Sequence, residues 1–395
     1  MRVALKLARQ ASRRISSRPL VGAVAVSGGR AAGHGYSGAD GKNPAALAAL
    51  QQAGALAAGS TLYTNAEPCS DADDTAQSLL RIIAMRPKRV VIGALATLFP
   101  LPEVANGAIE RLRSAGIAVD VGLMEKECRE FNAVYYKYAE TRLPFVTLKF
   151  AASLDGRIAT ATGDSQWISS KSSLRLAHQL RREHDAVLVG IGTVLSDNPR
   201  LTVRLVEGAS PLRVVVDSRL SIPLTASVLS DGLAAGTLIA TTSQADPSRI
   251  EQLKKLGVEV LVLPATDTRE TDPDSRRQPP ADAPPRRAVD LSALLAALGG
   301  RGIGSILVEG GAGIITSLLA EGRADRLVAA IAPKIIGRGL AAIGDLGIER
   351  LSDALTFSSV KMRKLGPDMI FDGRFDRSPA IAPVGQPVAE RRQNS

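Results

Sequence analysis

Residues 305–320 read SILVEGGAGIITSLLA, and this stretch decides the class of fold. Three apolar residues lead into Glu309, glycines follow at 310, 311 and 313, and an apolar segment with helical character comes next. The pattern predicts a buried strand, a turn and a helix, the repeating unit of an α/β protein. Free N–H groups at such a helix N-terminus bind phosphate, although glycines here would also suit a turn that only serves packing. A carboxylate that closes an apolar strand is costly to bury, so we expect Glu309 to meet a polar group.

The same alternation of strand and helix extends outward through the second half of the chain. A strand is expected from Pro144 into the segment PFVTLKFAASLDG, and others at 186–190, 213–216, 236–241, 258–263 and 305–308. Helices are expected at 171–182, 247–256, 291–298 and 313–320. Residues 264–287 hold many prolines, aspartates and arginines, and we interpret them as a flexible surface loop.

The first half of the chain shows a second α/β pattern. Strands are expected at 20–26, 60–64, 89–93 and 117–122, with helices at 4–15, 45–58, 75–85, 103–115 and 125–140. Strands separated by helices of this length indicate βαβ crossovers and a sheet covered by helices. At roughly 100–200 residues per domain, 395 residues suggest two or three domains. We place them at 1–142 and 143–378, followed by a polar tail, 379–395, expected to be disordered.

Composition excludes several classes of protein. Hydrophobic residues make up 45% and charged residues 22%, which rules out a mainly disordered, collagen-like or coiled-coil chain. No apolar stretch reaches the roughly 18–20 residues of a membrane helix, and the N-terminus lacks a signal-peptide core, so we expect a cytoplasmic protein with no membrane partner. Two distant cysteines exclude a disulfide framework, and three histidines leave few candidate metal ligands.

The chain is strongly basic, with a net charge of +10. This charge suits either nucleic acid or phosphorylated small molecules. Aromatic residues are only 3% of the chain, too few for an obvious base-stacking surface. Charge alone does not choose between these partners, and our expectation of a phosphorylated pyrimidine with no nucleic-acid partner depends on the sequence motifs described next.

A second polar cluster, residues 190–204 (GIGTVLSDNPRLTVR), follows an apolar strand. Its arginines, Arg200 and Arg204, have the forked geometry that captures phosphate. The Asp197-Asn198-Pro199 sequence within it is also typical of a plain turn.

A third cluster contains Lys149, Asp155, Ser165 and Trp167, the only tryptophan of the chain. A lone tryptophan usually belongs to a core, but here polar and glycine residues flank it. These features make the segment a candidate part of a site.

Four ordered motifs make the second half of the chain similar to the reductase domain of the bacterial riboflavin-biosynthesis deaminase–reductase family. They are LKFAASLDGRIATATGDSQWIS from residue 148, DAVLVGIGTVLSDNPRLTVR from 185, PLRVVVDS from 211 and ILVEGGAGI from 306. The resemblance implies a dihydrofolate-reductase-like fold, NADPH as cofactor and a homo-oligomer associated through the reductase sheets. It also implies reduction of 5-amino-6-(5-phosphoribosylamino)uracil to the ribitylamino compound, by hydride transfer to C1′ of the sugar.

The resemblance further implies roles for individual residues. NADPH contacts would fall on Ala151, Trp167, Thr193, Asp197, Ser218, Gly311, Ala312, Gly313, Ile314, Ile315, Thr316 and Ser317. Contacts to the substrate phosphate and base would fall on Ser165, Arg181, Leu201, Arg204 and Glu309. Glu309 can accept from a pyrimidine N–H or a sugar hydroxyl, and Lys149 and Asp155 are candidates to deliver or position a proton.

Residues 1–142 resemble the deaminase half of the same family, which has a cytidine-deaminase-like three-layer fold. That family binds zinc through one His and two Cys and moves protons with a Glu, in an H-A-E … P-C-x(8)-C arrangement. Here Cys69 remains, but Pro44 stands at the His position, Ala46 at the Glu position and Ser78 at the second Cys position. Catalytic zinc needs three protein ligands, so we expect neither zinc nor deaminase activity.

The leading hypothesis is thus an NADPH-dependent reductase whose deaminase domain is inactive. That domain is either a packing partner of the reductase or a docking site for a separate deaminase that acts upstream. One alternative is a still-bifunctional zinc deaminase–reductase. Another is a non-catalytic binder of phosphorylated pyrimidines or of RNA.

Overall fold

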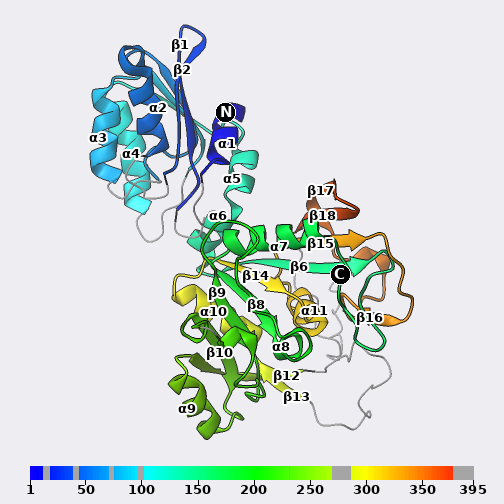
Figure 1. Cartoon of the computed structure of the whole chain (residues 1–395). Helices are drawn as coiled ribbons and strands as arrows, with labels where there is room; N and C mark the ends of the chain where they lie inside the picture. Colours follow the sequence, from blue (N-terminus) through cyan, green and yellow to red (C-terminus); the bar gives the residue numbers. More distant parts are fainter. Residues whose placement is uncertain are drawn as a thin grey trace, which may run out of the picture. The chain divides into compact units, whose positions relative to one another are not determined.

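The computed structural model describes residues 1–11, 18–38, 44–70, 75–95, 102–230, 232–268 and 286–376. The chain divides into two compact units, traced in sequence colours in Figure 1. Unit 1 comprises residues 1–145 and 298–304, and unit 2 comprises residues 146–297 and 305–395. Within the described ranges, no helix combines the length and apolar character needed to cross a membrane. Both cysteines, Cys69 and Cys128, are buried, and no disulfide joins them.

Unit 1 contains a five-stranded sheet in the order β2-β1-β3-β4-β5. Its strands are β1 (Gly22–Ser27), β2 (Arg30–Tyr36), β3 (Thr61–Ala66), β4 (Arg89–Ala94) and β5 (Ala118–Val121). β1 runs antiparallel to β2 and β3, whereas β3, β4 and β5 are parallel. Parallel neighbours require crossover connections, and helices α3 and α4 supply them.

Helices cover both faces of this sheet. They are α1 (Arg2–Ala8), α2 (Ala45–Ala53), the 3₁₀ turn η1 (Gly54–Ala57), α3 (Thr75–Ala84), α4 (Pro102–Ser114), α5 (Glu125–Phe131) and α6 (Ala133–Thr141). α2, α3 and α4 share one apolar core with Ala23 and Ala25 of β1. On the alternate side of β1, a Cβ at Gly22 would come within 2.0 Å of the Ala4 carbonyl oxygen in α1. Because successive strand residues face opposite sides, unit 1 has three layers.

Unit 2 is built on a nine-stranded sheet in the order β11-β10-β9-β8-β14-β6-β15-β18-β17. The strands are β6 (Phe145–Ser153), β8 (Ala186–Gly190), β9 (Leu212–Val216), β10 (Thr237–Thr242), β11 (Glu259–Leu263), β14 (Ser305–Glu309), β15 (Arg326–Ala332), β17 (Phe357–Leu365) and β18 (Asp368–Phe375). The run from β11 to β14 is parallel, as are β6 and β15, whereas β18 is antiparallel to β15 and β17.

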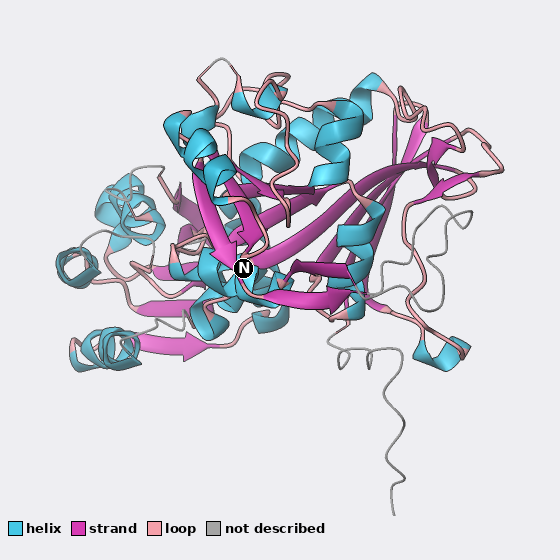
Figure 2. Ribbon diagram, turned by 90° about the horizontal axis from the view of Figure 1, so that it is seen from below, coloured by secondary structure: helices cyan, strands magenta, loops and turns pink. Residues whose placement is uncertain are grey.

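Helices and two short ribbons complete unit 2. The helices are α7 (Lys171–Glu183), α8 (Ile191–Asp197), α9 (Pro247–Lys255), α10 (Leu291–Gly300) and α11 (Ala312–Ala320), with 3₁₀ turns η2 (Ser227–Leu229), η3 (Ala234–Gly236) and η5 (Leu351–Asp353). The ribbons pair β7 (Arg157–Thr160) with β16 (Gly339–Ala341), and β12 (Ala265–Thr268) with β13 (Arg286–Val289). Figure 2 distinguishes strands from helices, and all five residues of β14 are buried. A strand buried on both faces is what the apolar run 306–308 predicts.

Several predicted elements need correction in unit 1. The helix expected over 4–15 ends at Ala8, and residues 12–17 lie outside the described part. The helix expected over 125–140 is interrupted at Asn132, whose side chain accepts from the N–H of Leu20 and donates to its carbonyl. Strand β2 was not predicted, because its glycines and polar residues hide the hairpin that follows Gly28-Gly29.

Unit 2 also departs from the sequence prediction. Residues 191–197 form helix α8 where a loop was expected, and β7, β15, β16, β17 and β18 were not predicted. The two ends of the expected loop 264–287 pair as the β12–β13 ribbon. Residues 269–285 and 377–395 lie outside the described part of the chain, so the loop and the tail stay predictions there.

Candidate active site

Strands β8 and β14 lie side by side and end at the same edge of the unit 2 sheet. Beyond β14, Gly310 and Gly311 both have φ of 77°, a region that favours glycine, and helix α11 starts immediately afterwards. A Cβ at either glycine would lie 3.4 Å from the Thr193 hydroxyl in the first turn of α8. The two glycines and the first turn of α11 therefore lie close to the Thr193 side chain, and we call this group the glycine cradle. Unpaired N–H groups of a helix start make such a cradle suitable for an anion.

A buried ion pair stands at the end of β14, next to the glycine cradle. Arg181 of α7 donates from Nε to Glu309 Oε1 at 2.6 Å and from Nη2 to Glu309 Oε2 at 2.7 Å. Both side chains are about nine-tenths buried. Burial alone would raise the pKa of Glu309, but the facing Arg181 guanidinium holds it below its ordinary value. The expected polar partner of Glu309 is thus an arginine of this chain.

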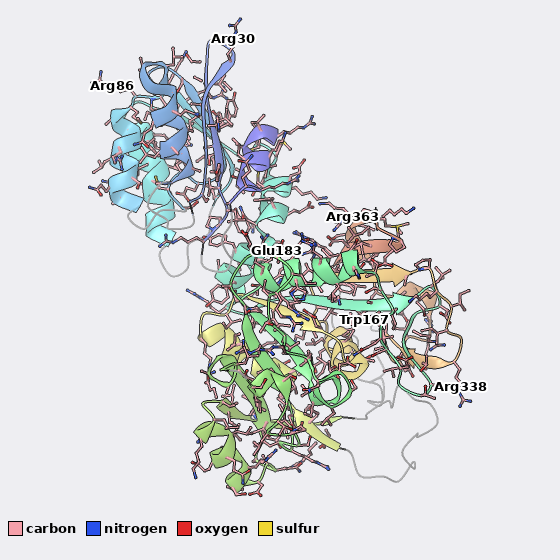
Figure 3. The ribbon with its side chains drawn as sticks, viewed as in Figure 1. Arg30, Arg86, Trp167, Glu183, Arg338 and Arg363 are labelled. Carbon is pink, nitrogen blue, oxygen red and sulfur yellow. The ribbon has the colours of Figure 1, made fainter. Side chains whose placement is uncertain are left out.

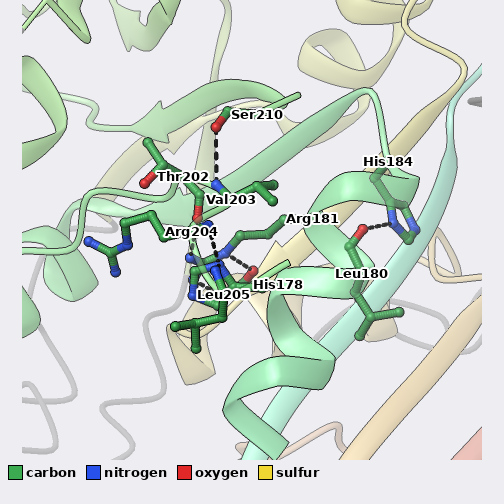
Figure 4. A network of polar contacts seen from close by, with 10 residues as sticks. His178, Leu180, Arg181, His184, Thr202, Val203, Arg204, Leu205 and Ser210 are labelled. Atoms are coloured by element: carbon green, nitrogen blue, oxygen red, sulfur yellow. Dashed lines mark hydrogen bonds and ion pairs between the residues drawn. The ribbon is translucent and has the colours of Figure 1, made fainter. Parts of the chain in front are cut away.

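This pairing changes the interpretation of Arg181. Its Nη1 also donates to the carbonyl of Thr202 at 3.0 Å, so the guanidinium is committed on three sides (Figure 4). We expected Arg181 to bind the substrate phosphate. In the structure it holds Glu309 and the segment beginning at Thr202, and its contact with the phosphate stays a prediction.

The segment after α8 contains a buried leucine, Leu201, and an exposed arginine, Arg204. Leu201 has φ of 53° and is buried in an apolar core, and its contact with the substrate stays a prediction. Arg204 is exposed. Burial, followed by the nearby Arg181 and Arg200 guanidinium groups, lowers the pKa of Arg204. Cations gathered in this way favour an anionic ligand.

Lys149 of β6 also belongs to this charged group. Burial lowers the pKa of its ammonium group, while the negative charge of Glu309 acts in the opposite direction. A lowered pKa makes this ammonium group a readier proton donor than an exposed lysine. The structure thus leaves Lys149 as a candidate for proton transfer.

Asp155 does not suit the proton-donating role considered for it. Its carboxylate accepts from Ser153 Oγ at 2.6 Å, from the N–H of Ile336 at 3.1 Å and from the N–H of Gly337 at 2.6 Å. These hydrogen bonds lower the pKa of Asp155 to about 2, so the carboxylate is ionised at neutral pH. It ties the turn after β6 to residues 336–337.

The loop after β7 brings three of the predicted residues close together. Ser165 Oγ donates to Asp197 Oδ1 at the end of α8 at 3.3 Å. Trp167 is 67% exposed, and its carbonyl accepts from Lys334 Nζ at 2.6 Å. Figure 3 labels Trp167 in unit 2. An exposed aromatic ring held through its backbone is available to stack on a ligand.

The other residues predicted to contact the cofactor differ in how accessible their side chains are. Ser218 follows β9, and its hydroxyl accepts from the N–H of Val289 while remaining able to donate. Ile315 and Thr316 of α11 are buried, and Thr316 Oγ1 donates to the Ala312 carbonyl. In α11, the backbone of the first turn is therefore better placed to meet a ligand than the later side chains. Ala151 packs against the core cluster that contains Leu180, Leu307 and Val328.

The positions matched to the deaminase zinc site lie in apolar surroundings of unit 1. Pro44 precedes α2 without a side-chain cap, and Ala46 and Cys69 belong to the same buried core cluster. Ser78 of α3 is also buried. Over the described ranges, no three His, Cys, Asp or Glu side chains gather closely enough to hold a metal ion. One thiol, one hydroxyl and two apolar side chains do not fit catalytic zinc.

Three contributors to the unit 2 site were missed at the sequence level. His178, Thr202 and Lys334 hold the segments that carry the expected ligand contacts. His178 lies three residues before Arg181 on a helix, so the two share a face, and that spacing was the available signal. No local pattern marks Thr202 or Lys334, since both act through contacts with distant parts of the chain.

We expect the Arg181–Glu309 pair to show strong coupling in a double-mutant cycle. Arg181→Met alone should lower the free energy of unfolding by about 3–5 kcal/mol, because Glu309 then keeps a buried charge without its counterpart. Glu309→Gln alone should lower it by less. Since the folded-state pKa of Glu309 lies below its ordinary value of 4.5, its stabilising contribution is present above that pH and lost as the pH falls further. Urea unfolding of the four proteins at pH 7 and pH 4 measures both effects; additive costs would contradict the coupling.

Family models match both parts of the chain. The RibD C-terminal domain model matches residues 144–371, and the model of the cytidine and deoxycytidylate deaminase zinc-binding region matches residues 1–94. These matches confirm the expected fold class, a cytidine-deaminase-like domain followed by the reductase domain.

Full-length relatives agree with the models. Riboflavin biosynthesis protein RibD of Aquifex aeolicus is 41% identical over 371 residues, covering 94% of this chain and 96% of the relative, and that of Bacillus amyloliquefaciens is 38% identical over 372 residues, covering 93% and 94%. The solved RibD of Acinetobacter baumannii aligns with a TM-score of 0.74 at 27% identity over 95% of this chain and 97% of that one. A Thermotoga maritima structure described as a diaminohydroxyphosphoribosylaminopyrimidine deaminase/5-amino-6-(5-phosphoribosylamino)uracil reductase aligns at 0.72 and 28% identity over the same shares. The chain therefore belongs to the RibD family of riboflavin biosynthesis proteins and is an enzyme whose C-terminal unit is that family's reductase domain.

Proposed function

We propose that this protein reduces 5-amino-6-(5-phosphoribosylamino)uracil to 5-amino-6-(5-phosphoribitylamino)uracil with NADPH, and that it has lost the deaminase activity. The reductase activity is named for the Thermotoga maritima relative, and this chain carries the matching domain. The structural observation that carries the proposal is the edge of unit 2. There the glycine cradle and the Arg181–Glu309 pair follow one strand, β14.

The residues at this edge fit NADPH. The glycine cradle has no side chain at positions 310 and 311, where the chain enters the N-terminus of α11, and a backbone approach of this kind suits a diphosphate. Thr193, Ser218 and the exposed Trp167 would complete the contacts from neighbouring segments. When bound, NADPH supplies the hydride that the C1′ atom of the substrate sugar receives.

The charged residues of this edge suit the phosphate and the polar groups of the substrate. Arg204, with Arg200 beside it, would bind the ribose phosphate through forked hydrogen bonds. Glu309, held ionised by Arg181, would accept from a pyrimidine N–H or a sugar hydroxyl. Reduction of the opened sugar adds one proton along with the hydride, and Lys149 is our candidate to deliver it.

The residues at the expected zinc-ligand and proton-carrier positions of unit 1 support the loss of deaminase activity. Ala46 at the glutamate position cannot carry a proton, and Pro44 and Ser78 replace two of three zinc ligands. The match of residues 1–94 to a zinc-binding region favours the alternative, a still-bifunctional enzyme. Under our proposal a separate deaminase must supply the substrate.

We expect Gly311→Val to weaken NADPH binding by roughly a hundredfold or more, because the side chain blocks the backbone approach and forces a strained φ. Gly322→Val is the matched control, since Gly322 also has a positive φ but lies at the far end of α11. Fluorescence titration with NADPH compares the two variants. Equal affinity in Gly311→Val and the parent protein would remove the glycine cradle from the cofactor site.

We also expect the purified protein to carry well under one zinc per chain and to release no ammonia from the diaminopyrimidine precursor. Metal analysis and an ammonia assay measure these quantities. Pro44→His alone should restore neither, because Ala46 and Ser78 remain, and a missing general acid/base costs roughly 10²–10⁴ in rate. Stoichiometric zinc together with ammonia release from the parent protein would establish the bifunctional alternative.

A further inference from the structure

Residues 202–205 lie in the connection between α8 and β9 and have no regular secondary structure, yet side chains bond several of their backbone groups. Arg181 Nη1 donates to the Thr202 carbonyl at 3.0 Å, and Ser210 Oγ accepts from the N–H of Val203 at 3.0 Å. Buried backbone polar groups outside helices and sheets need such partners. The segment is therefore held in one conformation by side chains.

His178 supplies the next of these contacts. Its side chain is 1% exposed, and Nδ1 accepts from the N–H of Arg204 at 2.9 Å, with the Leu205 nitrogen 3.5 Å from the same atom (Figure 4). Because a backbone N–H can only donate, Nδ1 carries a lone pair and the ring is neutral. Burial, reinforced by the positive charges of Arg181 and Arg204, lowers the pKa of His178 to about 4.

The helix that carries His178 is fixed at both ends. At its start, Asp368 accepts from the N–H and the hydroxyl of Ser170, which caps α7. At its end, His184 Nε2 is 2.9 Å from Thr147 Oγ1 of β6. A ring on a helix held in this way has a defined position, which a precise contact requires.

We propose that His178 is a positioning residue for substrate binding: by accepting from the backbone N–H of Arg204, it sets where the Arg204 guanidinium meets the substrate phosphate. The inference rests on the proposed function, which assigns the phosphate to Arg204. His178 acts on the arginine backbone and needs no contact with the ligand. One face of α7 thus organises two parts of the site, since Arg181 orients Glu309 and His178 orients Arg204.

The kinetic test uses the full chain and three substitutions of histidine. His178→Phe keeps a ring but removes the acceptor, and we expect KM for 5-amino-6-(5-phosphoribosylamino)uracil to rise roughly tenfold. KM for NADPH and kcat should stay within about twofold. His178→Asn places an amide oxygen at the same number of bonds from Cα as Nδ1 and should recover most of the affinity. His34→Asn, an exposed position in unit 1, should match the parent protein.

Arg204→Ala is the comparison that links the effect to the phosphate contact. It should raise the same KM, and adding His178→Phe to it should raise KM little further, because both act on one arginine. An unchanged KM in folded His178→Phe would overturn the inference. So would equal losses in His178→Phe and His178→Asn with a lower melting temperature in both, since that pattern indicates a purely structural ring.

A second measurement reads the protonation state of His178 in the parent protein itself. The chain has three histidines, so ¹⁵N spectra of the histidine-labelled parent protein can be assigned by comparison with His34→Asn and His184→Gln. We expect His178 to show an unprotonated, hydrogen-bonded Nδ1 and a protonated Nε2 at pH 7. A protonated Nδ1 would overturn the inference. A parent protein that fails to oxidise NADPH with the substrate would instead overturn the proposed function and leave the tautomer result standing.

Discussion

The buried ion pair between Arg181 and Glu309 is the constraint on which the rest of the unit 2 site depends. Two charges nine-tenths removed from water are tolerable only when geometry and hydrogen bonding are nearly complete. The forked contact fixes the rotation of α7 against the end of β14, and the third Arg181 bond fixes the chain at Thr202. The Glu309 carboxylate and the chain at Thr202 are consequently held by one guanidinium, and such fixed geometry favours binding and catalysis.

Both units are α/β folds, but the side chains at the compared positions differ in polarity. In unit 2, the strand end carries charged side chains that pair with one another. In unit 1, the helix start at Pro44 and the neighbouring Ala46 and Cys69 lie against an apolar core. Apolar packing stabilises the layers of unit 1, because the stability of a fold depends on its core and not on the residues of its site. Within the family, this chain thus joins the reductase domain to a deaminase-like fold, and under our proposal the metal-binding and proton-carrying positions of that fold are now apolar or neutral.

Local patterns predicted the strand–turn–helix units and the need of Glu309 for a polar partner, because periodicity and burial cost are properties of short segments. They did not predict that the partner is Arg181, since the two residues meet only through the sheet order. Helix α8 was missed because Gly190, Gly192 and the Asp197-Asn198-Pro199 sequence resemble a turn, and tertiary packing of Val194 overrides that preference. The break at Asn132 has the same origin, a side chain bonded to the distant backbone of Leu20.

The most direct test of the account measures NADPH oxidation by the purified protein with each of two substrates in parallel. The account predicts oxidation with 5-amino-6-(5-phosphoribosylamino)uracil and none with its diaminopyrimidine precursor, unless an independent deaminase is added. Oxidation with the precursor alone, preceded by ammonia release, would contradict the loss of deaminase chemistry. No oxidation with the deaminated substrate would contradict the central claim that this edge of unit 2 is a working reductase site.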